Sequence, residues 1–309
     1  MAKRSDAIKR GRRRRTAVQA AFALLTNARL GGFVSGTIYR GAGKQLCMPG
    51  LNCYSCPGAL GSCPIGAIQA TLGARSYKFA FYAFGFLMVV GALLGRVVCG
   101  FLCPFGLVQD LLHRIPVPAR LRRVKLPGDR LLRLVKYVLL ALFVVLLPLC
   151  VVDLVGQGQP WFCKYVCPSG TLLGGIPLLA ANEGLRAAAG WLFRWKFALL
   201  AAVCALSVFC LRPFCKYVCP LGAIYGLFNR VALYRFQLDA ARCTGCGACA
   251  RACGMGVDPH RTPNSAECIR CGECIRACPH GALCATLAPG GAAPGTPGRG
   301  GSASPAPRH

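Results

Sequence analysis

The chain has 309 residues, of which 55% are hydrophobic and only 15% are charged, with 37 Lys and Arg against 9 Asp and Glu. A mean hydropathy of +0.49 excludes an ordinary soluble domain and indicates a protein of the lipid bilayer. The basic residues flank apolar segments, as membrane orientation requires, so we expect no nucleic-acid partner.

The N-terminal segment combines a basic stretch, residues 1–15, with an apolar stretch over 16–39. A signal peptide has the same order of charge and hydrophobicity. This apolar stretch is long, however, and contains Asn27 and Arg29. We therefore expect a basic cytoplasmic N-terminus followed by a retained transmembrane helix.

Three further apolar segments, at about 77–98, 134–152 and 191–211, each approach the ~20 residues that a helix needs to cross a bilayer. The 96–136 loop is rich in Lys and Arg, whereas the 40–76 and 153–190 loops are not. The positive-inside rule then places both termini in the cytoplasm. We predict an α-helical membrane protein with about four transmembrane helices, and a transmembrane domain over 16–235.

The transmembrane domain repeats the motif Cys-Pro-x-Gly four times, beginning at Cys63, Cys103, Cys167 and Cys219. Three copies have a second cysteine four residues upstream, and two of these share the hexapeptide Cys-Lys-Tyr-Val-Cys-Pro. Residues i and i+4 lie on one face of a helix, so each pair can present two sulfurs in one direction. The proline suits the first position of a new helix.

The predicted topology divides these cysteines into two candidate metal centres. The inner set is Cys99, Cys103, Cys215 and Cys219. The outer set is Cys56, Cys63, Cys163 and Cys167. Thiolates suit an iron–sulfur centre, copper or zinc. The alternatives are buried structural thiols and, for the outer set, disulfides.

Residues 236–285 contain two runs of the spacing C-x2-C-x2-C-x3-C, which is typical of a bacterial two-cluster ferredoxin domain of the α+β class. The last cysteine of each run ligates the other cluster in such domains. The predicted ligands of cluster 1 are Cys243, Cys246, Cys249 and Cys278. The predicted ligands of cluster 2 are Cys268, Cys271, Cys274 and Cys253. A zinc site is disfavoured, because a tetrahedral ion has no use for the third closely spaced cysteine.

Two details of this C-terminal part depart from a simple ferredoxin. Cys253 is followed by Gly254, where the second run has Pro279 after its last cysteine. We expect the thiolate to remain a ligand and the following loop to take a different path. Residues 286–309 are rich in Gly, Pro and Ala, and we expect a disordered tail there.

The cysteine repeat within apolar spans, followed by two ferredoxin runs, resembles the membrane-bound polyferredoxins. These are typified by the quinol dehydrogenase subunit of periplasmic nitrate reduction and the membrane core of the nitrous oxide reductase maturation protein. The resemblance covers residues 16–285 and implies a multi-pass electron carrier of the bacterial inner membrane. It further implies two [4Fe-4S] clusters, redox partner proteins, and a link between the quinone pool or a cytoplasmic donor and a respiratory or maturation acceptor.

A redox-sensing or scaffolding role is disfavoured, because sensing needs one labile centre and this chain has at least two, and two other functions follow from these features. The first is electron transfer through iron–sulfur centres. The alternative is a copper or thiol reductase that assists assembly of a metalloenzyme such as a terminal oxidase, with the outer set as its working site. Quinol oxidation also needs a proton acceptor, and an ionisable group at membrane depth is a functional candidate. The few candidates, which the sequence equally allows to be interfacial, are Asp110, His113, Asp153 and Glu183.

Overall fold

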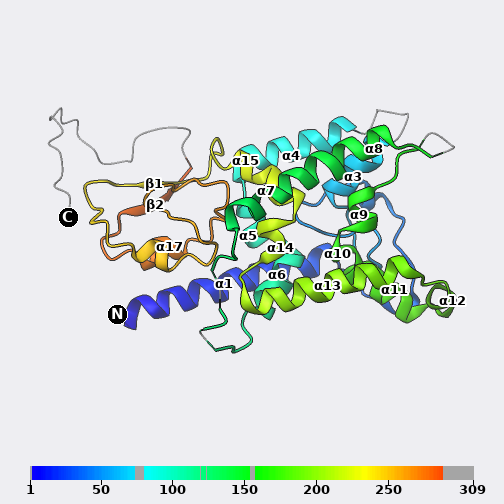
Figure 1. Cartoon of the computed structure of the whole chain (residues 1–309), viewed down its shortest axis with the longest axis horizontal. Helices are drawn as coiled ribbons and strands as arrows, with labels where there is room; N and C mark the ends of the chain where they lie inside the picture. Colours follow the sequence, from blue (N-terminus) through cyan, green and yellow to red (C-terminus); the bar gives the residue numbers. More distant parts are fainter. Residues whose placement is uncertain (1, 74–79, 119, 123, 154–156, 288–309) are drawn as a thin grey trace.

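The computed structural model describes residues 2–73, 80–118, 120–122, 124–153 and 157–287, so nearly all of the predicted disordered tail lies outside the described residues (Figure 1). The molecule is elongated. A helical part, residues 2–234, occupies most of its length, and a small ferredoxin part, residues 235–286, lies at one end beside the start of helix α1.

The helical part is built from many short helices and a few long ones. Its first half contains α1 (Ala2–Thr26), α2 (Gly31–Ser35), the 3-10 helix η1 (Ala42–Gln45), α3 (Pro64–Leu72), α4 (Ala80–Leu94), α5 (Val97–Phe101) and α6 (Pro104–Leu112). Its second half contains α7 (Asp129–Leu139), the π-helix η3 (Leu140–Leu146), α8 (Leu147–Cys150), α9 (Trp161–Tyr165), α10 (Pro168–Gly170), the π-helix η4 (Thr171–Gly175), α11 (Ile176–Ala181), α12 (Glu183–Ala187), α13 (Trp191–Phe209), α14 (Pro213–Tyr217) and α15 (Pro220–Phe228).

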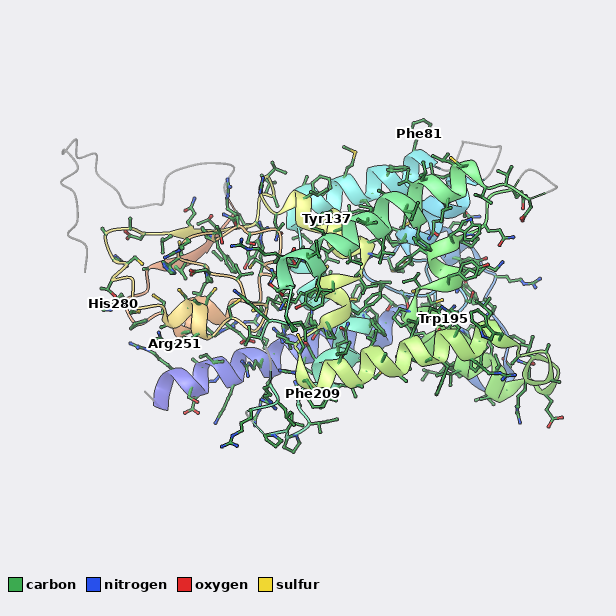
Figure 2. All side chains as sticks on the ribbon, in the orientation of Figure 1. Phe81, Tyr137, Trp195, Phe209, Arg251 and His280 are labelled. Atoms are coloured by element: carbon green, nitrogen blue, oxygen red, sulfur yellow. The ribbon has the colours of Figure 1, made fainter. Side chains whose placement is uncertain are left out.

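Two continuous helices within the described residues are long and apolar enough to cross a membrane, Asp129–Cys150 and Trp191–Phe209. They coincide with two of the four predicted spans. The predicted 77–98 span contains the shorter apolar helix α4. Large apolar side chains are exposed on these helices, such as Phe81 on α4, which projects outward in Figure 2, and Trp191 on α13. An apolar exterior of this kind is unusual for a soluble monomer.

The predicted first span, 16–39, is wrong in extent. Helix α1 begins at Ala2, includes the basic segment, and ends at Thr26. The Thr26 hydroxyl donates to the Phe22 carbonyl at 2.8 Å, and the Asn27 amide donates to the Ala23 carbonyl at 2.9 Å. These side chains satisfy carbonyls of the last turn, so the helix can end there without leaving them unpaired.

Each Cys-Pro-x-Gly motif begins a helix, as predicted. The cysteine is the N-cap residue in extended conformation, and the proline occupies the first turn of α3, α6, α10 or α15. In two copies the cap sulfur accepts the backbone N–H of the motif glycine at 3.4 Å, from Gly106 to Cys103 and from Gly222 to Cys219. The motif therefore fixes the position of a sulfur atom at a helix N-terminus.

The ferredoxin part is a two-stranded antiparallel sheet with two short helices. Strand β1 (Arg235–Leu238) pairs with β2 (Leu283–Thr286), with Arg235 opposite Thr286. The loops between the strands carry α16 (Ala248–Arg251) and α17 (Glu273–Ala277). Phe236 and Leu283 are buried beneath these loops with Cys249, Cys268 and Cys274.

Buried carboxylates hold the ferredoxin part against the helical part. Glu267 forms ion pairs with Arg96, at 3.1 Å, and with Lys136. Glu273 at the start of α17 is paired with Arg12 at 2.7 Å and with Arg15 at 3.4 Å, both on α1. The basic N-terminal segment therefore packs on the ferredoxin part, which the sequence did not predict.

Replacing Glu267 by alanine is expected to destabilise the protein by about 3–5 kcal/mol, because Arg96 and Lys136 would remain buried without their carboxylate. Glu183→Ala is the matched control, since Glu183 is exposed, and a change within about 0.5 kcal/mol is expected there. Thermal unfolding of the cluster-loaded protein in detergent measures both. Equal melting temperatures for the two variants would contradict the role of Glu267.

Candidate iron–sulfur centres

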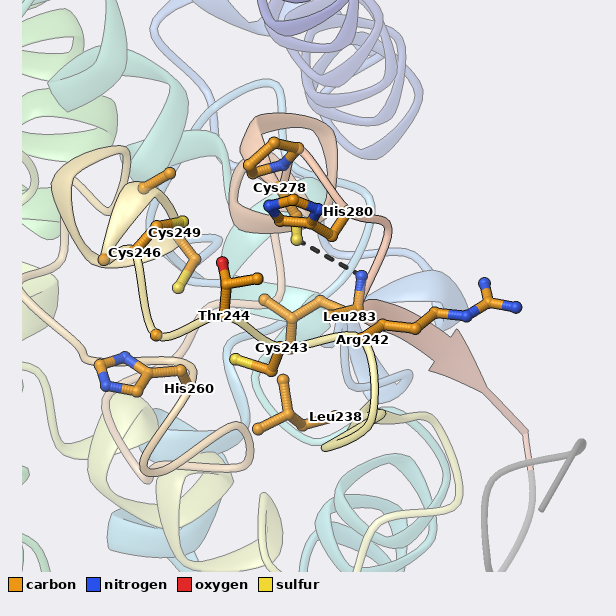
Figure 3. A pocket seen from close by; sticks show the side chains of 15 residues that line it. Leu238, Arg242, Cys243, Thr244, Cys246, Cys249, His260, Cys278, His280 and Leu283 are labelled. Atoms are coloured by element: carbon orange, nitrogen blue, oxygen red, sulfur yellow. Dashed lines mark hydrogen bonds between the residues drawn. The ribbon is translucent and has the colours of Figure 1, made fainter. Parts of the chain in front are cut away.

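The four predicted ligands of cluster 1 line one small cavity of the ferredoxin part. Figure 3 shows the thiols of Cys243, Cys246, Cys249 and Cys278 arranged around it. Gly245 and Gly247 have φ of +68° and +69°, a conformation that glycine adopts without strain and that lets three cysteines share one tight loop. The Cys278 sulfur accepts the Ala282 N–H at 3.4 Å. This cavity of four thiols fits a [4Fe-4S] cluster.

The predicted ligands of cluster 2 also lie together. Cys268, Cys271 and Cys274 interact electrostatically with one another, and each interacts with Cys253 from the first run. The departure after Cys253 has a packing reason. A Cβ on Gly254 would lie 2.5 Å from the Leu211 side chain, which packs there. Glycine at this position lets the loop approach the helical part closely.

The inner set is brought together in the middle of the helical part. Cys99, Cys103, Cys215 and Cys219 are all buried and interact electrostatically. Two cationic side chains hold the backbone of these turns. Arg212 donates to the Cys99 and Gly100 carbonyls, and Arg96 donates to the Cys215 carbonyl at 2.8 Å.

The outer set is brought together only in part. Cys63, Cys163 and Cys167 interact with one another, and the thiol that interacts with all three is Cys53. The fully buried Cys56 instead donates a hydrogen bond to the Asn27 side chain at 3.4 Å. Cys53 and Cys56 stand three residues apart in one loop, so spacing alone does not distinguish them. Across the described ranges, no three His, Cys, Asp or Glu side chains converge as closely as one metal ion requires.

The four candidate proton acceptors are held in ion pairs or hydrogen bonds, or are exposed at the surface. Burial alone would raise the pKa of Asp110, but the charges of Arg212 and Arg15 and the Arg212 hydrogen bonds hold it below its usual value. Burial lowers the pKa of His113, whose Nδ1 lies 3.2 Å from the Ser207 carbonyl oxygen. Asp153 accepts a hydrogen bond from Gln159 at 2.8 Å, and Glu183 is exposed at the start of α12.

Paired cysteine runs on a small antiparallel sheet define a ferredoxin-type iron–sulfur protein. Comparison with protein families agrees with this class. One family, described as a 4Fe-4S binding domain, matches residues 78–127, 137–182 and 191–238. A second family of the same description matches residues 236–257 and 262–284. The chain belongs to the 4Fe-4S binding proteins of the polyferredoxin type.

Individual relatives match about half of the chain. The methylamine utilization ferredoxin-type protein MauN of Paracoccus denitrificans is 31% identical over 57% of this chain and 52% of its own length. YccM of Escherichia coli is 27% identical, over 54% of this chain and 43% of its own length. The regulatory protein NosR of Pseudomonas aeruginosa is 28% identical, over 52% of this chain and 20% of its own length. The chain spans about half the length of MauN and less of the other two. No solved structure gives a significant match.

The ferredoxin ligands are tested by Cys274→Ala, with Cys284→Ala as control. Cys274 belongs to the predicted cluster 2 ligands, whereas the Cys284 thiol lies 3.9 Å from the Gln237 carbonyl oxygen in the sheet. Loss of one ligand is expected to remove about four irons per chain from the first variant and none from the second. Iron and acid-labile sulfide are measured on anaerobically purified protein. Full iron in Cys274→Ala would contradict the assignment.

Asp110 predicts a pH dependence. Its folded-state pKa lies below the unfolded value of about 3.9, so its contribution to stability is full above that pH and is lost as the pH falls through the folded pKa. Asp110→Asn should therefore lower the melting temperature by a constant amount from about pH 6 to 8, and by less below about pH 4. A difference from wild type that grows on acidification would contradict the ion pairs with Arg212 and Arg15.

Proposed function

We propose that the protein carries electrons across the cytoplasmic membrane of a bacterium, between redox partners at its ferredoxin end and the quinone pool. The main support is a close backbone contact between the two turns that carry the inner set and the cluster 2 ligands. Gly100 lies between Cys99 and Cys103, and a Cβ there would be 2.5 Å from the Ile269 carbonyl oxygen, next to Cys268. The turn of the inner set and the turn of cluster 2 therefore touch, which supports electron transfer between them.

The order of the thiol groups along the molecule gives further support. In Figure 1 the ferredoxin part lies at one end, α5, α6 and α14 lie in the middle, and α3, α9 and α10 lie beyond them. The ferredoxin part carries the ligands of clusters 1 and 2. The middle helices carry the inner set, and the helices beyond them carry the outer cysteines. When bound, [4Fe-4S] clusters supply one-electron carriers at such positions, with potentials set by charge, hydrogen bonds and exposure. Buried Arg212 and Arg96 provide positive charge beside the inner set.

A cavity of about 850 Å³ beside the outer cysteines supports the quinone pool as one partner. Its wall combines the thiols of Cys53 and Cys163 with apolar Leu51 and with the amines of Lys44 and Lys196. An apolar wall with a few polar groups is typical of a site for an amphipathic small molecule. A quinol head group has this chemistry.

The ferredoxin end favours an acidic protein partner. Arg242 is exposed beside the cluster 1 cavity, and Arg251 is exposed on α16. Exposed cations around a redox centre steer an anionic protein toward it and raise the association rate, with strong dependence on salt. The proposed electron route thus has an acidic soluble carrier at one end and a lipid-soluble carrier at the other.

Reconstituted protein tests this function. We expect about twelve or more irons per chain, and reduction of the clusters by a water-soluble quinol, followed by electron paramagnetic resonance. Cys215→Ser should remove about four irons while leaving the ferredoxin signals. About eight irons in the wild type would contradict an inner centre. Reoxidation of reduced clusters by Cu(II), lost in Cys163→Ser, with no response to quinol, would replace the proposal by copper reduction.

A further inference from the structure

We propose that the outer cysteines hold a centre of their own, with Cys53, Cys63, Cys163 and Cys167 as ligands, and that Gln69 is its positioning residue, as Gln109 is at the inner set. This inference rests on the proposed function, since it assumes that thiols of the helical part bind iron–sulfur clusters. It adds a fourth centre and a residue that adjusts its reduction potential.

Two glutamines occupy matching positions in the repeat. Gln69 stands six residues after Cys63, and Gln109 stands six residues after Cys103. Both side chains are buried. Gln69 Nε2 lies 3.3 Å from Cys163 Sγ, and Gln109 Nε2 lies 3.2 Å from Cys215 Sγ. Cys163 and Cys215 are the first residues of the two identical hexapeptides, so each glutamine joins one Cys-Pro-x-Gly helix to one hexapeptide.

The other end of each carboxamide fixes its orientation. Gln69 Oε1 accepts the backbone N–H of Phe162 at 2.9 Å, and Gln109 Oε1 accepts that of Phe214 at 3.2 Å. A backbone N–H can only donate, so it must face the oxygen of the amide, and the NH2 group must then face the sulfur. Each glutamine is therefore a buried donor aimed at a thiolate. Hydrogen bonds of this kind stabilise the more negative, reduced state of a cluster and raise its potential.

Cys53 completes the outer centre. It interacts with Cys63, Cys163 and Cys167, as Cys99 interacts with the other three members of the inner set. A Cβ on Gly170, in the motif that begins at Cys167, would lie 3.6 Å from Cys53 Sγ. A Cβ on Gly66, in the motif that begins at Cys63, would lie 3.9 Å from Cys163 Sγ. All four thiols line the cavity of about 850 Å³ described above, so a cluster held by them would occupy part of it and leave the remainder to a quinol.

The backbone at the two centres is held in a corresponding way. Lys196 donates to the Cys163 carbonyl at 3.1 Å, and Arg96 donates to the Cys215 carbonyl at 2.8 Å. Each centre therefore combines two cysteines that cap Cys-Pro-x-Gly helices, a hexapeptide cysteine that accepts a glutamine N–H, and a cation on the carbonyl of that cysteine. Only the fourth ligand differs in its local sequence. It is Cys99 at the inner set and Cys53 at the outer centre.

The ligand assignment is tested by Cys53→Ala against Cys56→Ala. These cysteines stand in the same loop, and Cys56 is bonded to Asn27 instead of the other outer thiols. We expect about sixteen irons in the wild type, about twelve in Cys53→Ala and about sixteen in Cys56→Ala. Unchanged ferredoxin signals in electron paramagnetic resonance establish that each variant is folded. The assignment is overturned by about twelve irons in the wild type, by full iron in Cys53→Ala, or by loss confined to Cys56→Ala. About eight irons in the wild type would instead contradict the proposed function itself.

The positioning role is tested by Gln69→Glu, with Gln109→Glu as its matched counterpart. Glutamate keeps an oxygen to accept the Phe162 N–H but no longer offers the amide donor, so the local fold is retained. We expect the ratio of reduced to oxidised outer centre at a fixed potential to fall about tenfold, a shift of about 59 mV for one electron. The Gln109 variant should shift a different signal in a potentiometric titration. Unchanged midpoint potentials at full iron content would overturn this role and show that both glutamines only connect the helices.

Discussion

The structure depends on a small number of buried carboxylates in a chain whose charged residues are mostly basic. Asp110, Glu267 and Glu273 are buried, and each lies between at least two Arg or Lys side chains from distant segments. An unpaired buried charge is strongly destabilising, so each carboxylate requires all of its partners at once. Glu267 and Glu273 fix the ferredoxin part on Arg96, α7 and α1, and Asp110 joins α6 to α1 and to Arg212. The contact between Gly100 and Ile269, which brings the inner set to cluster 2, follows from that docking.

Features that depend on the spacing of nearby residues could be predicted from the sequence. The cysteine runs predict the two sets of ferredoxin ligands, whose thiols the structure brings together, because three closely spaced thiols of one tight loop can meet one cluster. Cys-Pro-x-Gly predicts helix starts, because proline is accommodated in the first turn. Contacts between distant segments were not predictable in this way. The choice of Cys53 over Cys56 depends on where the loop packs, and Gln69 and Gln109 carry no signal except their equal offset from Cys63 and Cys103.

The two identical hexapeptides show where local sequence stops determining structure. Both fold as a short helix that ends before a capping cysteine, and both first cysteines accept a glutamine N–H. Their lysines differ. Lys216 is fully buried, with the Val124 carbonyl and Asp129 as partners, whereas Lys164 reaches the Gln159 side chain near the surface. The backbone and the sulfur positions repeat, while the surroundings that tune each centre are supplied separately by the rest of the fold.

The pairing of α1 with α17 has a consequence for biogenesis. A ribosome makes Arg12 and Arg15 early and their partner Glu273 only after most of the chain has left the exit tunnel. Glu273 lies between Cys271 and Cys274, so its position depends on a loop that iron is expected to shape. Helix α1 therefore acquires this neighbour only after Glu273 has been made and its loop has been shaped by the metal. The ion pairs between α1 and α17 would therefore form only in protein that has received its clusters. In protein without iron, the basic helix α1 would lack its docking site.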